Sequence, residues 1–124
     1  MGYFRRLAVT VTTDALGAGV GYTEEPVNGY IHEIVYDKTD FADGSTMTVT
    51  GDSTGTAIWT ESAVNADAVR LPRTQVCGPT GTALTYDGTR IVAEPVALAD
   101  ERVKIVVASG GDKKTGVFYV VVGA

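Results

Sequence analysis

The stretch "RVKIVVASGGDKKTGVFYVVVG", residues 102–123, is the most apolar part of the chain and the part that decides its fold. Its two apolar runs, "RVKIVVAS" and "GVFYVVVG", are rich in valine, which is stiff at χ1 and suits strands better than helices. The polar loop "GGDKKTG" separates them. We therefore expect a terminal hairpin of two antiparallel strands, buried on both faces or nearly so.

Alternation of apolar and polar residues predicts further strands upstream. "RLAVTVTTD", residues 6–14, alternates Leu7, Val9 and Val11 with small or polar residues, as a half-buried strand does. "STMTVTG", residues 45–51, repeats this pattern. In "NGYIHEIVYDK", residues 28–38, the alternation predicts that four side chains share one face: Tyr30, His32, Ile34 and Tyr36.

Turn signals about every ten residues divide the chain into short strands. The clearest is Asp87-Gly88 within "ALTYDGTRIV", which favours a type I′ hairpin. "DAVRLPRTQV" predicts a strand that ends or becomes an edge at Pro72. "AEPVALADE", residues 93–101, is the one stretch that could form a helical turn or two. These signals predict an all-β single domain over residues 1–124, an antiparallel β-sandwich, jelly-roll-like, with eight or nine strands and little or no helix.

Charge and cysteine content narrow the classes of partner. The net charge of −5 repels phosphate, so we expect no nucleic-acid partner. The chain has no apolar run of the length that spans a membrane, so we expect a soluble protein synthesised in the cytoplasm, with no membrane partner. Its only cysteine, Cys77, cannot form an internal disulfide.

Three aspartates at a spacing of three residues, Asp37, Asp40 and Asp43, suggest a metal loop at first sight. An EF-hand loop that begins at Asp37 would need glycine at its sixth position and glutamate at its twelfth. Ala42 and Thr48 occupy those positions. We therefore interpret the segment as a bend between two strands and expect no metal.

Two further motifs resemble catalytic or cofactor-binding patterns. "GDSTG", residues 51–55, places Ser53 in a G-x-S-x-G pattern, but a strand pattern follows where a nucleophile elbow needs a helix. The only histidine, His32, lies alone in an alternating strand. "GAGVG", residues 17–21, lacks the helix that a dinucleotide-binding loop precedes. We therefore expect neither an enzyme nor a cofactor.

The remaining candidates belong to surfaces. Cations at strand ends and in loops discourage edge-to-edge aggregation, and together they could contact an acidic partner. The only tryptophan, Trp59, is the one candidate platform for a carbohydrate. The predicted interaction surface contains seven residues: Arg5, Arg6, Trp59, Arg70, Arg73, Lys113 and Lys114.

Four segments resemble a family of small structural proteins encoded beside the capsid genes of tailed bacteriophages. They are "KTDFADG" (38–44), "IWTESAVNA" (58–66), "LPR" (71–73) and "LADERVKIVVASGGDKKTGVFYVVVG" (98–123), and the resemblance extends over roughly residues 7–123. It implies a virion structural protein, specifically a capsid cement or decoration protein that bridges neighbouring major capsid proteins. It associates no catalytic residue with the family.

The resemblance also implies a location and an assembly. The chain would bind the major capsid protein on the exterior of the capsid and form a homo-oligomer, with a trimer preferred slightly over a dimer. Two alternatives stay open. One is another virion component, of the tail, the connector or a head fibre, and the other is a carbohydrate-binding β-sandwich module.

Overall fold

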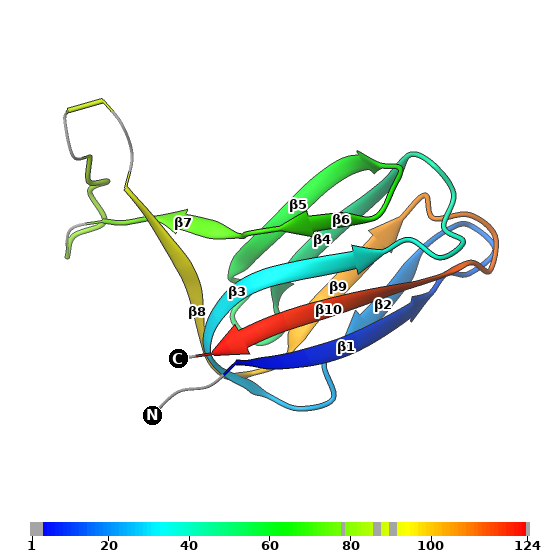
Figure 1. The fold of residues 1–124 in the computed structure, drawn as a ribbon, viewed down its shortest axis with the longest axis horizontal. Coiled ribbons are helices and arrows are strands. Elements are labelled where there is room, and N and C mark those ends of the chain that lie inside the picture. Colours follow the sequence, from blue (N-terminus) through cyan, green and yellow to red (C-terminus); the bar gives the residue numbers. More distant parts are fainter. Residues whose placement is uncertain (1–3, 78, 86–87, 90–91, 124) are drawn as a thin grey trace.

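A computed structural model describes residues 4–77, 79–85, 88–89 and 92–123. Two antiparallel sheets pack face to face, so the predicted all-β sandwich is confirmed (Figure 1). The described part has no helix and contains ten strands rather than eight or nine. The strands are β1 (Arg5–Thr12), β2 (Gly19–Tyr22), β3 (Val27–Asp37), β4 (Ser45–Gly51), β5 (Ala57–Val64), β6 (Ala68–Arg70), β7 (Arg73–Gln75), β8 (Ala93–Glu101), β9 (Val103–Ala108) and β10 (Thr115–Gly123).

The two sheets differ in size and in connection. One has six strands in the order β1-β10-β3-β8-β7, with β6 also paired to β3, and we call it the front sheet. The other has four strands in the order β2-β9-β4-β5, and we call it the back sheet. Strand β3 is long enough to pair with β8 near its start and with β6 near its end. Most connections cross from one sheet to the other.

The prediction of a terminal hairpin is wrong. Strand β9 lies between β2 and β4 in the back sheet, whereas β10 lies between β1 and β3 in the front sheet. Each strand buries alternate side chains in the space between the sheets, Val103, Ile105 and Val107 from β9 and Phe118, Val120 and Val122 from β10. Crossing between the sheets places the two apolar stripes on opposite sides of one core, so that they pack against each other.

Aromatic side chains fill one end of this core. Tyr36 and Phe118 stack with their ring centroids 4.9 Å apart. The Tyr36 ring also stacks on Phe41, with 6.2 Å between the two centroids. All three side chains are buried. The Phe41 ring packs against the backbone of Gly116 and fills the space that a Cβ at this position would need. Glycine at 116 therefore allows the loop before β4 to close over the end of the sandwich.

The prediction that Tyr30, His32, Ile34 and Tyr36 share one face is also wrong. Ile31, Ile34 and Tyr36 face the core, while Tyr30 is 41% exposed. The register of β3 against β10 shifts between the partners Glu33 and Ile31, where β10 continues without a gap from Val121 to Val122. This β-bulge places one extra residue of β3, His32, out of register and reverses the face of every residue before it.

Two local expectations have different outcomes. Residues 93–101, which we considered as helix, form strand β8, because pairing with β3 and β7 and burial of Val96 and Leu98 outweigh their weak helical tendency. Pro72 separates β6 from β7, as predicted. The turn predicted at Asp87-Gly88 lies partly outside the described residues.

Strands β7 and the first residues of β8 leave the sandwich together and form a projecting arm (Figure 1). We define the arm as the described residues from 71 to 95. Beyond the β7–β8 pairing, Val76 and Val92 form a backbone hydrogen bond of 2.8 Å, and Cys77 pairs with Ala83. Nearly every described residue of the arm between 73 and 94 is exposed or only half-buried, so the arm has no core of its own.

Replacing Phe118 with alanine should destabilise the protein strongly, because it removes a fully buried ring that stacks on Tyr36. We expect a loss of about 3–5 kcal/mol in the free energy of unfolding, measured by urea denaturation. Leu16→Ala is the matched control, because Leu16 is 90% exposed and its truncation should change stability by less than about 0.5 kcal/mol. A Phe118→Ala loss below about 1 kcal/mol would contradict the described core.

Candidate interaction surfaces

The predicted cations of β1 point to different neighbours. Arg5 forms an ion pair with Glu25, with 3.6 Å between Nη1 and Oε2. Arg6 instead lies over the ring of Tyr119, with its Cζ 4.7 Å from the ring centroid. Since adjacent residues of a strand face opposite sides, the two arginines cannot form one patch.

Trp59 and Arg70 belong to one cluster with Glu61. The Trp59 Nε1–H donates to Glu61 Oε1 at 3.2 Å, and Arg70 donates to both oxygens of Glu61, at 2.7 and 2.8 Å. These hydrogen bonds from Arg70, followed by that from Trp59, lower the pKa of Glu61. The cluster joins β5 of the back sheet to β6 of the front sheet and so closes one side of the sandwich.

The contacts of this cluster limit what Trp59 and Arg70 can present to a partner. The Trp59 ring is partly buried and packs against the core, so it does not form an open platform for a sugar. The Arg70 guanidinium is engaged by Glu61 rather than presented freely to a partner. Both residues therefore support the sandwich itself.

The other predicted cations lie elsewhere. Arg73 lies at the base of the arm, where its Nη1 donates to the carbonyls of Pro72 at 2.7 Å and His32 at 3.1 Å. Lys113 and Lys114 are exposed in the loop between β9 and β10. The structure thus distributes the seven predicted surface residues over separate places and brings together only Trp59 and Arg70.

The three aspartates of the predicted bend each hold a different part of the chain. Asp37 Oδ1 accepts the Thr39 N–H at 3.3 Å, Asp40 Oδ1 accepts the Thr115 N–H at 2.6 Å, and Asp43 pairs with Lys38. The segment connects β3 to β4, so its interpretation as a bend is confirmed. In the described ranges, no group of three or more His, Cys, Asp or Glu side chains is arranged to hold a metal ion.

Ser53 lies in the turn between β4 and β5, where it takes part in a structural contact. Its N–H donates to Glu101 Oε1 at 3.1 Å, alongside the N–H and hydroxyl of Thr54. His32 belongs to the front sheet, where its ring centroid lies 4.7 Å from that of Phe4 and 6.4 Å from that of Tyr30. The structure therefore gives Ser53 and His32 separate neighbours and does not bring them together.

Glu101, the last residue of β8, holds the turn between β4 and β5. Its carboxylate is buried and accepts the hydrogen bonds from Thr54 and Ser53. Those bonds, the Thr54 N–H first, lower the pKa of Glu101. Gly51 makes room for it, since a Cβ there would lie 2.8 Å from the Glu101 Cδ. Sequence patterns offered no signal for this contact, because it joins residues far apart in the chain.

The arm presents exposed apolar side chains. Leu71 is 60% exposed, Leu84 is 45% exposed and Val92 is 36% exposed. Residues 76–85 carry no charged side chain. This surface was not predicted from the sequence, although a long stretch rich in turn residues and poor in charge was a signal for it.

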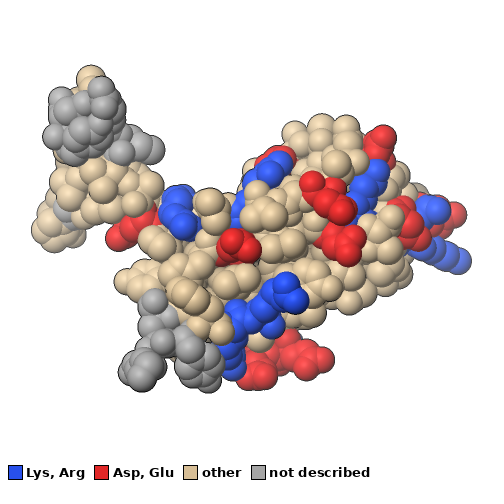
Figure 2. Space-filling model, in the orientation of Figure 1, with Lys and Arg blue, Asp and Glu red and all other residues tan. Residues whose placement is uncertain are grey.

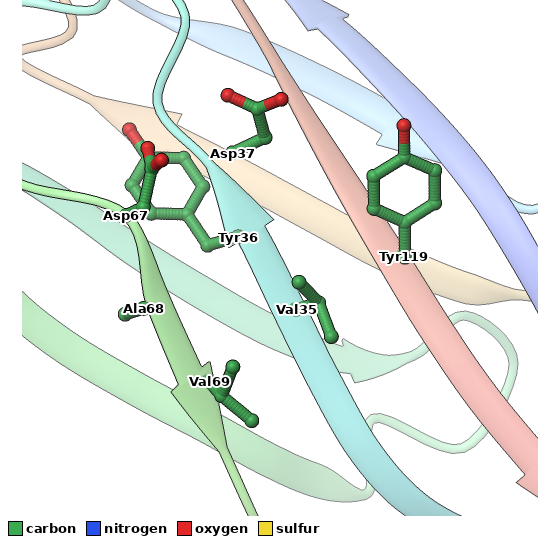
Figure 3. A pocket seen from close by; sticks show the side chains of 7 residues that line it. All are labelled: Val35, Tyr36, Asp37, Asp67, Ala68, Val69 and Tyr119. Carbon is green, nitrogen blue, oxygen red and sulfur yellow. The ribbon is translucent and has the colours of Figure 1, made fainter.

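A pocket of about 330 Å³ opens on the solvent side of the front sheet (Figure 3). Its lining combines apolar side chains, one half-buried tyrosine ring and two carboxylates, and consists of Val35, Tyr36, Asp37, Asp67, Ala68, Val69 and Tyr119. The pKa of Tyr36 is raised to about 12, first by burial and then by the negative charges of Asp67 and Asp37. An arrangement with this potential attracts a cation rather than an anion.

Comparisons with known proteins add no family to this description. No family model matches the chain, and no curated protein matches its sequence. Within the described residues, no helix has the length and apolar content that crossing a membrane would take.

Replacing Glu101 with glutamine should lower the melting temperature at pH 7, because the buried carboxylate would no longer accept charge-assisted hydrogen bonds. The folded-state pKa lies below the unfolded value of about 4.3, so this stabilisation is present above pH 4.3 and is lost as the pH falls through the folded pKa. The difference in melting temperature between wild type and Glu101→Gln should therefore shrink below about pH 4.

Glu24→Gln is the control, since Glu24 is exposed and should give a small difference at every pH. A difference for Glu101→Gln that stays constant between pH 7 and about pH 3 would contradict the role of the ionised carboxylate.

Proposed function

We propose that this chain is a structural protein of a bacteriophage virion, a capsid cement or decoration protein. It binds the exterior of the shell and bridges neighbouring copies of the major capsid protein. The role is one of binding and mechanical support rather than catalysis. The resemblance of four segments to virion structural proteins supports the proposal, and the projecting arm is the structural observation that carries it.

The arm needs a partner surface to be stable. A two-stranded ribbon on its own is marginal in water, because it has too few neighbours to bury its apolar side chains. Its pairing continues away from the body through Val76 and Val92, beyond the reach of the sandwich core. A partner protein that covers the arm supplies the missing contacts.

The chemistry of the arm suits a dry contact with protein. Interfaces are depleted of charge at their centres, and residues 76–85 contain none. Covering the exposed parts of Leu71, Leu84 and Val92 contributes on the order of 1 kcal/mol for each side chain. That contribution is modest for one copy, but a shell repeats it in every bound copy.

The body complements the arm in this role. Two tightly packed sheets form a stiff support for a projecting contact. The net charge of −5 suits a position outside the shell, away from the packaged genome. Neighbouring contacts on one lattice act together, so modest affinities resist outward pressure by avidity.

Copy number separates this proposal from the other virion locations. Quantitative gel analysis of purified particles of the encoding phage should give on the order of hundreds of copies for a shell protein. About 6 or 12 copies would instead favour the tail or the connector and would overturn the cement role.

Replacing Leu84 with aspartate should weaken binding to capsid shells that lack this chain, because it places a charge in the apolar contact of the arm. We expect a loss of at least about tenfold in affinity, measured by cosedimentation with the shells. Leu16→Asp is the matched control, since Leu16 is also exposed but lies in the turn between β1 and β2. Equal binding by wild type and Leu84→Asp would exclude the arm as the contact.

A further inference from the structure

The solvent side of the front sheet has an apolar centre. The strand register places Ala8, Tyr119, Val35 and Val69 beside one another on β1, β10, β3 and β6. Their neighbours along each strand face the core, so these four side chains face outward. Val69 is 55% exposed, and Tyr119 and Val35 are half-buried. Figure 2 shows a tan area on this side, with blue and red side chains around it.

Charged residues of opposite sign lie on the two sides of this apolar row, at diagonally opposite corners of the surface. Arg6 is paired with Val121, one outward position to one side of the row. Asp37 is paired with Val117, one outward position to the other side, and Asp67 lines the same pocket from the start of β6. We call the surface made by these residues and the apolar row the outer face.

Within the described residues, neither corner has an ionic partner of its own. Arg6 places its guanidinium over the Tyr119 ring and forms no ion pair with the residues that the structure describes. Asp37 and Asp67 each use one oxygen to accept a backbone N–H, from Thr39 and Lys38 respectively. The nearby ammonium group of Lys38 is engaged by Asp43 and the Asn65 carbonyl. Both corners are therefore available to charges from another molecule.

The pocket at the acidic corner also contains a buried polar group without a partner. The Tyr36 hydroxyl is buried and forms no hydrogen bond with the described part of the chain, although Tyr36 lines the pocket. In Figure 3 the side chains of Asp37 and Asp67 flank the pocket on the same side as the Tyr36 ring. A donor group that enters the pocket could satisfy this hydroxyl and both carboxylates.

We propose that two copies of this chain associate through their outer faces about a two-fold axis, with Arg6 of each copy entering the acidic pocket of the other. A second copy fits because one face carries both the cation and its receptor. This is the self-complementarity that an isologous interface requires. The dimer goes beyond the proposed function and does not depend on it, whereas the resemblance favoured a trimer slightly over a dimer.

The register makes this geometry consistent. Strands are about 4.8 Å apart and outward residues about 6.7 Å apart along a strand, so Arg6 and Asp67 lie roughly 20 Å apart across the face. The midpoint lies between Tyr119 and Val35. An axis in the plane of the face, perpendicular to the line from Arg6 to Asp67, places both Arg6 residues opposite acidic corners at once. Glu33 lies off this line, beside Val121 and close to the axis at the edge of the face, so the Glu33 residues of the two copies approach each other there and weaken the dimer.

The size of the face determines the strength expected. Four strands and three outward rows cover roughly 400 Å² in projection on each copy, below the roughly 800 Å² per partner of a standard stable interface. We therefore expect a reversible dimer with a dissociation constant in the range of about 1–100 µM.

Sedimentation velocity of the full chain over about 1–200 µM tests this proposal directly. Wild type should change from monomer to dimer across the range. Arg6→Glu alone, and the double variant Asp37→Lys with Asp67→Lys, should each weaken the dimer by at least about tenfold. A mixture of the two should recover it, because the acid introduced at position 6 of one copy then meets the lysines introduced in the other.

The controls change the same charges elsewhere. Lys113→Glu matches Arg6→Glu, and Glu24→Lys with Asp112→Lys matches the double variant, all at exposed positions outside the outer face. Val69→Glu, at a 55% exposed position, tests the apolar row even if the aspartate variants fold poorly. A wild-type monomer or trimer at every concentration, unchanged association of Arg6→Glu, or no recovery in the mixture would each overturn the proposal. Shell binding by a monomeric variant would leave the cement role intact.

Discussion

The fold depends on one constraint, which is that β9 and β10 must bury their apolar stripes in the same space while they belong to different sheets. Six side chains from these two strands meet between the sheets, and aromatic stacking of Phe118 on Tyr36 closes one end. The short loop after Ala108 turns the chain from one sheet to the other, with Ser109 and Lys113 at positive φ. Because both strands are central, every other described strand except β7 of the arm is positioned by pairing with them directly or through one neighbour.

Central placement of β10 also determines what the outside of the molecule offers. Since Phe118 and Val120 face the core, Tyr119 must face solvent, next to Val35 of β3. The outer face is thus a consequence of the same alternation that builds the core. On the side away from β10, strand β3 pairs with both β6 and β8. The arm begins where β8 leaves β3 and pairs with β7.

The arm and the outer face can act at the same time, because they lie on different parts of the molecule. In the proposed function the arm contacts a capsid subunit, and in the proposed dimer the outer face contacts a second copy. A dimer with two arms would bind two sites on the shell, so the second contact forms at a high effective concentration. This division assigns apolar docking to the arm and charge-specific pairing to Arg6 and the pocket of Asp37 and Asp67.

Local alternation was sufficient to predict the all-β class, the strand at residues 45–51 and the bend of the three aspartates, because side-chain period and turn chemistry are properties of neighbouring residues. It could not predict that β9 and β10 separate into two sheets, that a bulge at His32 reverses the face of Tyr30, or that residues 93–101 extend as β8. Nor could it place Asp37 beside Asp67, or Glu101 beneath the turn of Ser53. Those features come from pairing and burial between distant segments, whose free energy is set only when the whole core is assembled.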